Sequence, residues 1–219
     1  MRKLILLLLV IITTLEVQAQ RRRSQYEILT VGLGQGVTTS QLTADGRKGF
    51  HKYGMRGGIF LNSNVGGMMG FQVEANYVER GTRYWTNFYA LEDSARLGPG
   101  YYVQLNYLEF PLLLQYKLDK LIGAPPGLIL ATGISYARLT NQKEVAAPPG
   151  ENNILPRTFN KNEFSWHTGF SFVMASGFAI TYRFSRSLFD GARIHPDTGE
   201  KQLNVTMSLM LSYQVSILN

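Results

Sequence analysis

The sequence predicts an all-β protein, an eight-stranded antiparallel transmembrane β-barrel with long extracellular loops and short periplasmic turns. Three observations predict this class: a signal-like N-terminus, segments in which apolar and polar residues alternate, and connections that alternate in length. Alternation with a period of two is typical of a strand with two different faces. An even number of such strands can close into a barrel without an unpaired edge, as a bilayer requires.

The composition excludes several other classes. Of the 219 residues, 17% are charged, below the roughly 25% usual in soluble domains, whereas glycine (22), tyrosine (12) and phenylalanine (12) are abundant. The chain has no cysteine, which excludes disulfide frameworks, thiolate metal sites and cysteine nucleophiles. The formal net charge of +7 is modest, and we expect a membrane surface rather than nucleic acid as its counterpart.

The first nineteen residues are predicted to be a cleaved signal peptide. Arg2 and Lys3 precede an apolar run over residues 4–12, and Val17-Gln18-Ala19 has the small-residue pattern of a cleavage site. The apolar run is shorter than the ~20 residues that cross a bilayer as a helix. The sequence therefore predicts signal peptide 1–19 and an exported barrel domain, 20–219.

The first three strands are predicted at residues 27–37, 53–61 and 71–77, where apolar residues alternate with polar residues or glycine. The glycines at 32, 34 and 36 superficially resemble a nucleotide-binding fingerprint, but they lie within a strand that no helix follows. A crowded barrel interior is the simpler explanation for them.

The fourth strand, residues 101–118, is the longest, and its apolar parity changes midway. Val103, Leu105 and Tyr107 alternate, and the apolar series then moves to the even positions from Leu108 onwards. One extra residue, a β-bulge, would produce this change. Pro111 follows and cannot donate a ladder hydrogen bond, which favours a locally unpaired position and argues against a buried helix.

The last four strands are predicted at residues 128–137, 164–174, 178–185 and 203–217. The final strand has about fifteen alternating residues, long enough to cross an outer membrane at a tilt. The predicted long connections are 38–52, 79–100, 139–163 and 190–202, and the short ones are 62–67, 119–126 and 175–177. The alternative is a secreted β-sandwich or a soluble lipocalin-like barrel, but the polar faces are too small and glycine-rich to coat a soluble surface.

One strand carries a recognisable motif, the sequence Asn-Tyr-Leu-Glu-Phe-Pro-Leu-Leu-Leu-Gln-Tyr-Lys-Leu from residue 106. Its motif residues are Tyr107, Leu108, Glu109, Phe110, Pro111, Leu112 and Leu113. This strand resembles the signature strand of the PorT-type outer-membrane β-barrel family of the Bacteroidota. The resemblance implies an eight-stranded outer-membrane barrel with a periplasmic N-terminus. The family is functionally broad; one member belongs to a secretion apparatus for C-terminally tagged proteins.

Several charged residues are predicted to point into the lumen. They are Arg56, Glu74, Glu109, Lys117, His167 and Arg183. They could line a polar conduit, or they could pair into a network that fills the barrel. We favour the network, because an eight-stranded interior is just wide enough for side chains and a lone buried charge is costly. Glu109 is the predicted salt-bridge partner of Arg56 or Arg183.

Other candidate residues lie near the predicted loops. Arg80, Arg83 and Arg96 are placed in or beside the second long loop, facing anionic lipopolysaccharide, and Arg21, Arg22 and Arg23 lie near the inner leaflet. His51 and His195 fall in loops and His167 on an inner face, so no catalytic set can be placed in register. We predict no catalytic residue, metal site or cofactor.

The predicted function is a non-enzymatic structural or interaction role in the outer membrane. Its predicted partners are outer-membrane lipids, lipopolysaccharide, and envelope proteins such as those of a protein-secretion assembly. A narrow pore for water or small solutes is the alternative, and a lipid-modifying enzyme is a third class.

Overall fold

The structure is a computed structural model that describes residues 29–43, 49–65, 67–83, 102–145, 159–189, 193–194 and 199–218. The predicted signal peptide and residues 21–23 lie outside this part of the chain, as do Arg96 and His195. Within the described ranges, no helix is both long enough and apolar enough to cross a bilayer.

Eight strands close into one barrel in the order β1, β10, β7, β6, β5, β4, β3, β2, and every neighbouring pair is antiparallel. The barrel strands are β1 Leu29–Leu42, β2 Lys52–Val65, β3 Met69–Arg83, β4 Tyr102–Lys117, β5 Leu128–Val145, β6 Asn162–Val173, β7 Phe178–Ser187 and β10 Asn204–Leu218. Two short strands, β8 Arg193–Ile194 and β9 Lys201–Gln202, pair with each other in a separate two-stranded sheet. The predicted closed eight-stranded barrel is confirmed.

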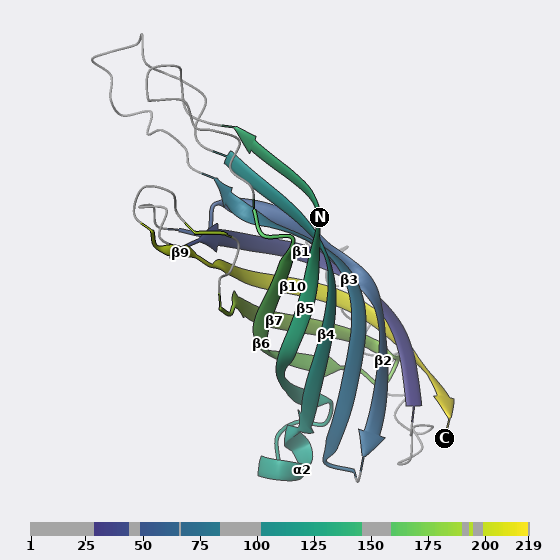
Figure 1. The fold of residues 1–219 in the computed structure, drawn as a ribbon. Coiled ribbons are helices and arrows are strands. Elements are labelled where there is room, and N and C mark those ends of the chain that lie inside the picture. The colour runs from purple at the N-terminus through teal and green to yellow at the C-terminus, as the bar shows by residue number, and fades with distance from the viewer. Residues whose placement is uncertain are drawn as a thin grey trace, which may run out of the picture.

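The two ends of the barrel differ (Figure 1). Helix α2, Leu118–Ile122, and the last residues of β10 lie at one end, here called the turn end, and β9 lies at the opposite end, the loop end. Short turns face the periplasm in outer-membrane barrels, and we expect the turn end on that side. Helix α2 ends at Gly123 in the left-handed region (φ 66°), and the sequence pattern does not predict it.

Several strands extend further toward the loop end than predicted. β1 ends at Leu42, β3 at Arg83 and β5 at Val145. The connection between β1 and β2 is therefore residues 43–51, slightly shorter than the turn-end connection 118–127 that contains α2, and the alternation of connection lengths is less strict than predicted. The pattern misses these ends because the outward-facing residues there, such as Gln41 on β1 and Glu79 on β3, are polar, so the apolar series that identifies a strand stops earlier.

Strand β4 shows this change most clearly, because its outward-facing residues are polar at Gln104 and Asn106 and apolar from Leu108 onwards. Its odd-numbered residues from Val103 to Gln115 are all buried, and Leu113 is 0% exposed whereas Leu112 is 51% exposed. The predicted bulge in this strand is therefore wrong, because the backbone keeps its alternation and only the chemistry of the two faces changes. A register shift does lie beside Asn106 and Tyr107, but the extra residue is Thr140 on β5.

The outer wall of the barrel is apolar. Large side chains on it are half exposed, among them Ile134 (56%), Phe170 (51%) and Leu209 (54%). An apolar surface that surrounds the molecule is unstable in water but matches the hydrocarbon core of a bilayer. The interior is correspondingly tight: a Cβ on the inward-facing Gly32 would meet the ring of Phe60. This contact supports a crowded interior as the reason for that glycine.

Candidate functional site: the barrel interior

Strand β4 passes through three successive layers of the interior, with Leu105, Glu109 and Gln115 in order from the loop end. The first layer is the apolar cap, the second the ion network, and the third the turn-end cavity. The apolar cap consists of Leu42, Val103, Leu105, Tyr107, Ala137 and Phe159. The ion network consists of Arg56, Glu74, Arg80, Glu109, Glu163, His167 and Arg183.

The small β8–β9 ribbon packs against the apolar cap. The guanidinium carbon of Arg193 on β8 lies 4.2 Å from the ring centroid of Phe159. Arg193 Nε donates to Gln202 Oε1 at 2.6 Å, and its Nη1 lies 3.3 Å from Glu144 Oε2. These contacts tie the fourth long connection to the cap and to the extended end of β5.

Glu109 is the centre of the ion network. Its Oε2 lies 2.8 Å from Nη2 of Arg56, and its Oε1 contacts Nη2 of Arg80. Ser135 Oγ donates to the same Oε1 at 3.1 Å, and His167 Nε2 lies 3.5 Å from it. One carboxylate thus joins side chains from β2, β3, β5 and β6.

Glu74 forms the second junction. Arg183 binds it with two parallel hydrogen bonds, each 2.7 Å long, from Nη1 and Nη2. The amide nitrogens of Asn76 and Gln72 also donate to it, at 2.6 and 2.5 Å. Arg56 links the two junctions, because its Nη2 also lies 3.6 Å from Glu74 Oε2.

Arg80 extends the network toward the apolar cap. Its Nη1 donates to Glu163 Oε1 at 2.6 Å, and its guanidinium carbon lies 5.3 Å from the ring centroid of Tyr107. Asn204 Nδ2 donates to the other oxygen of Glu163 at 2.6 Å. The network therefore makes a second contact with β6, through Glu163, and also reaches β10.

The charges of the network balance. It contains three arginines and three glutamates, and all six are buried. Within the described residues, Nε, Nη1 and Nη2 of Arg56 have no hydrogen-bond partner, so the 2.8 Å approach of Nη2 to Glu109 is close but poorly directed. Such a network adds little net stability, because burying the charges offsets their attraction, but removing one member leaves an uncompensated charge.

Five of the six predicted lumen residues lie together in the network; the exception is Lys117. Lys117 is the last residue of β4 and lines the turn-end cavity. Of the two predicted partners for Glu109, Arg56 is in contact with it, whereas Arg183 pairs with Glu74.

Sequence reasoning missed two members of the network. Arg80 was expected on an external loop facing lipopolysaccharide, and Glu163 at the end of the third loop; both expectations are wrong, because each side chain is buried inside the barrel. The signal that could have found them is the alternation of inward and outward positions along each strand, continued beyond the apolar segment. Arg80 shares its parity with Glu74, and Glu163 shares its parity with His167.

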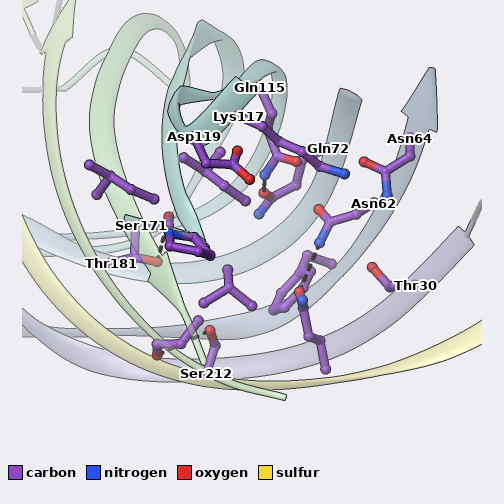
Figure 2. A pocket seen from close by; sticks show the side chains of 18 of the residues that line it. Thr30, Asn62, Asn64, Gln72, Gln115, Lys117, Asp119, Ser171, Thr181 and Ser212 are labelled. Carbon is purple, nitrogen blue, oxygen red and sulfur yellow. Dashed lines mark hydrogen bonds between the residues drawn. The ribbon is translucent and has the colours of Figure 1, made fainter. Parts of the chain in front are cut away.

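The turn-end cavity has a volume of about 460 Å³ (Figure 2). Its lining includes side-chain amides, and Figure 2 shows Gln72 and Gln115 side by side, with the Gln115 amide donating to Gln72. Asn62 Nδ2 donates to Gln214 Oε1 at 3.1 Å on another wall. Arg183 also lines the cavity, so its inner end is the ion network.

One group superficially resembles a hydrolytic triad. His167 Nε2 lies 2.7 Å from Ser135 Oγ, with Glu109 beside both. In a Ser-His-acid triad the acid binds Nδ1 while the serine faces Nε2. Here serine and glutamate both face Nε2, Nδ1 has no partner within the described residues, and all three side chains are buried. The same described residues contain no group of three or more acidic or histidine side chains that could hold a metal ion.

Comparison with known proteins gives the family. A family model described as "Outer membrane protein beta-barrel domain" matches residues 18–192. No curated protein sequence matches the chain.

Among solved structures, Ail, the attachment invasion locus protein of Yersinia pestis, is 12% identical, with a TM-score of 0.47 over 85% of this chain and 98% of Ail. Neisserial surface protein A is 10% identical (TM-score 0.42; 84% and 96% covered), and the outer membrane enzyme PagL is 14% identical (0.43; 84% and 98%). Likenesses this distant carry no argument about function. The family match covers most of the chain, and the protein belongs to the outer membrane protein beta-barrel domain family.

Proposed function

We propose that the protein is a closed, non-enzymatic outer-membrane barrel that serves as an anchor and interaction platform in the cell envelope. The observation that carries this proposal is the ion network, whose paired arginines and glutamates span the lumen. The apolar cap lies on the loop-end side of the ion network, so an apolar layer and a charged layer both lie between the two ends of the lumen. Such a barrel offers its loops and outer wall to partners rather than a channel.

The proposal includes export through a signal peptide cleaved after Ala19, and lipopolysaccharide as the lipid around the loop-end half of the wall. The resemblance to PorT-type barrels supports a finer proposal, a place in a protein-secretion assembly. The motif strand contributes to the interior as well as to the wall of the barrel, because its Glu109 is the centre of the ion network.

A narrow pore for water or small solutes is the second candidate function. The turn-end cavity supports it, because its lining residues reach from the turn end of the lumen as far inward as Arg183. The ion network and the apolar cap oppose it.

Conductance of the refolded mature protein in a planar bilayer separates the two candidates. We expect no steps from wild-type protein whose heat-modifiable gel mobility shows a folded barrel. A matched variant in which Arg80 and Glu109 are both replaced by serine removes one positive and one negative charge, so the net charge of the ion network is unchanged, and a leak from it would show that the assay detects an opened lumen. Reproducible ohmic steps from the wild type would contradict the closed barrel.

The interaction role is tested in the native envelope. Residues 148–153 of the third long connection are replaced by a glycine-serine linker of equal length. We expect envelope proteins that cross-link to the wild type to be lost from this variant and kept in the paired Arg80→Ser and Glu109→Ser variant. Equal cross-linking in both would contradict a role for this loop.

A further inference from the structure

We propose that the outer wall of β5, β6 and β7 carries a binding site for a phosphorylated glycolipid headgroup of the lipid A type, held by Arg138 and Arg186. The inference rests on the outer-membrane orientation proposed above. It does not depend on whether the lumen conducts.

Both arginines mark the point where the apolar wall ends. On β5 the outward-facing residues Ile134 and Tyr136 precede Arg138, and on β7 Tyr182 and Phe184 precede Arg186. Each arginine is exposed and lies on the lipid-facing side of its strand. Since both follow the apolar series on its loop-end side, they lie at the level where hydrocarbon gives way to headgroups in the outer leaflet.

The strand register places the two arginines within reach of one headgroup. Arg138 is paired with Asn162 on β6, and Arg186 is paired with Trp166, four residues further along β6. Two strand spacings and this offset separate the two Cα positions by roughly 16 Å. Their long side chains can therefore approach phosphates on the two sides of a disaccharide. A single phospholipid phosphate would occupy only one of them.

The surface between them supplies contacts for the rest of such a molecule. Asn162 Oδ1 accepts hydrogen bonds from Arg138 Nη1 at 2.7 Å and from the Tyr136 hydroxyl at 2.9 Å, which orients the guanidinium along the wall. Phe164 lies beside them, with its ring centroid 5.5 Å from that of Tyr136. On the outward faces of β5, β6 and β7 as described, no carboxylate accompanies the arginines.

Phe189 completes the aromatic surface in an unusual backbone conformation. Its φ is 54°, and it is the one non-glycine residue with positive φ within the described residues. Its side chain is 74% exposed, and its ring meets Phe164 edge-on at 6.3 Å. A bulky residue is strained in this region. Here the strained backbone holds an aromatic ring outward at the headgroup level, beside an arginine pair suited to phosphate.

The test measures lipid binding to the full mature protein in detergent by native mass spectrometry. The probes are lipid A, lipid A with its phosphates removed, and phosphatidylglycerol. The variants are the double substitution Arg138→Gln with Arg186→Gln, and a control, Lys143→Gln, which removes a positive charge from an exposed position further along β5. Heat-modifiable mobility confirms that each is folded.

We expect the double variant to bind lipid A at least tenfold more weakly than the wild type, and Lys143→Gln to bind it as the wild type does. The wild type should bind dephosphorylated lipid A and phosphatidylglycerol as weakly as the double variant binds lipid A. Unchanged binding in the double variant, an equal loss in Lys143→Gln, or equal affinity for phosphatidylglycerol overturns the proposal. Conductance of the same preparations is scored separately, so a leaky barrel that binds lipid A contradicts only the closed-barrel function.

Discussion

The Arg80 guanidinium contacts the Glu109 carboxylate inside the barrel, and both side chains are fully buried. Glu109 also approaches Arg56, so one carboxylate faces two arginines from different strands. Because β2, β3 and β4 meet at this carboxylate, its loss should affect stability more than the loss of any exposed charge.

Replacing Glu109 by glutamine tests this junction. The change leaves Arg56 and Arg80 with less compensating charge at a site without solvent, and we expect the free energy of unfolding to fall by about 3–5 kcal/mol. Urea unfolding in lipid vesicles, followed by tryptophan fluorescence, measures it. Glu200→Gln makes the same chemical change at an exposed position near β9 and should shift stability by less than about 0.5 kcal/mol. Equal effects of the two substitutions would show that the buried junction has no special role.

The pair Glu74 and Arg183 is suited to a double-mutant cycle, because its two hydrogen bonds are parallel and equal in length. Glu74→Gln leaves Arg183 without its carboxylate, and Arg183→Gln leaves Glu74 with only the 3.6 Å contact to Arg56, whereas the double change removes both charges. We expect the double variant to be less destabilised than the sum of the single variants, with a coupling energy of about 1–3 kcal/mol. Additive unfolding free energies would mean that the pair is not coupled, despite its geometry.

The inward direction of several network residues follows from the alternation of inward and outward positions along a strand. For the others, the prediction also requires knowing where each strand ends. Glu74, His167 and Arg183 lie within clear alternating segments, so their inward direction can be predicted from the sequence. Arg80 and Glu163 lie at strand ends where the outward-facing neighbours, Glu79 and Asn162, are polar, so the apolar pattern that identifies a strand does not extend to them.

Pairing within the lumen is harder to predict than direction. Lys117 has the inward parity of Glu109, but it lies eight residues further along β4, at the turn end. Which inward residues meet depends on strand register and tilt around the whole barrel, and a single segment of sequence does not contain that information. The closed eight-stranded fold was predictable because alternation repeats in every strand.

Cysteine accessibility tests the division between the turn-end cavity and the ion network. The chain has no cysteine, so a single introduced thiol can be labelled without background. Ser171→Cys lies in the cavity wall, and Ser135→Cys lies beside Glu109 at 2% exposure. We expect a small charged thiol reagent, added from the periplasmic side, to label Ser171→Cys rapidly and Ser135→Cys at least tenfold more slowly. Comparable labelling rates would mean that solvent passes through the network.

The final prediction concerns the lipid-facing wall. Leu112 lies on the outward face of the motif strand and is 51% exposed, while its neighbour Leu113 is fully buried. Arginine on the lipid face near the bilayer midplane destabilises a barrel by about 2–4 kcal/mol, and by about 0–1 kcal/mol near the interface. We therefore expect Leu112→Arg to lower the free energy of unfolding in vesicles by the larger amount. Asn141→Arg places the same side chain at an exposed position on the loop-end extension of β5, and its effect should be small. If both variants are equally stable in vesicles, Leu112 does not face the hydrocarbon core, and the barrel sits at a different depth from the one its apolar wall indicates.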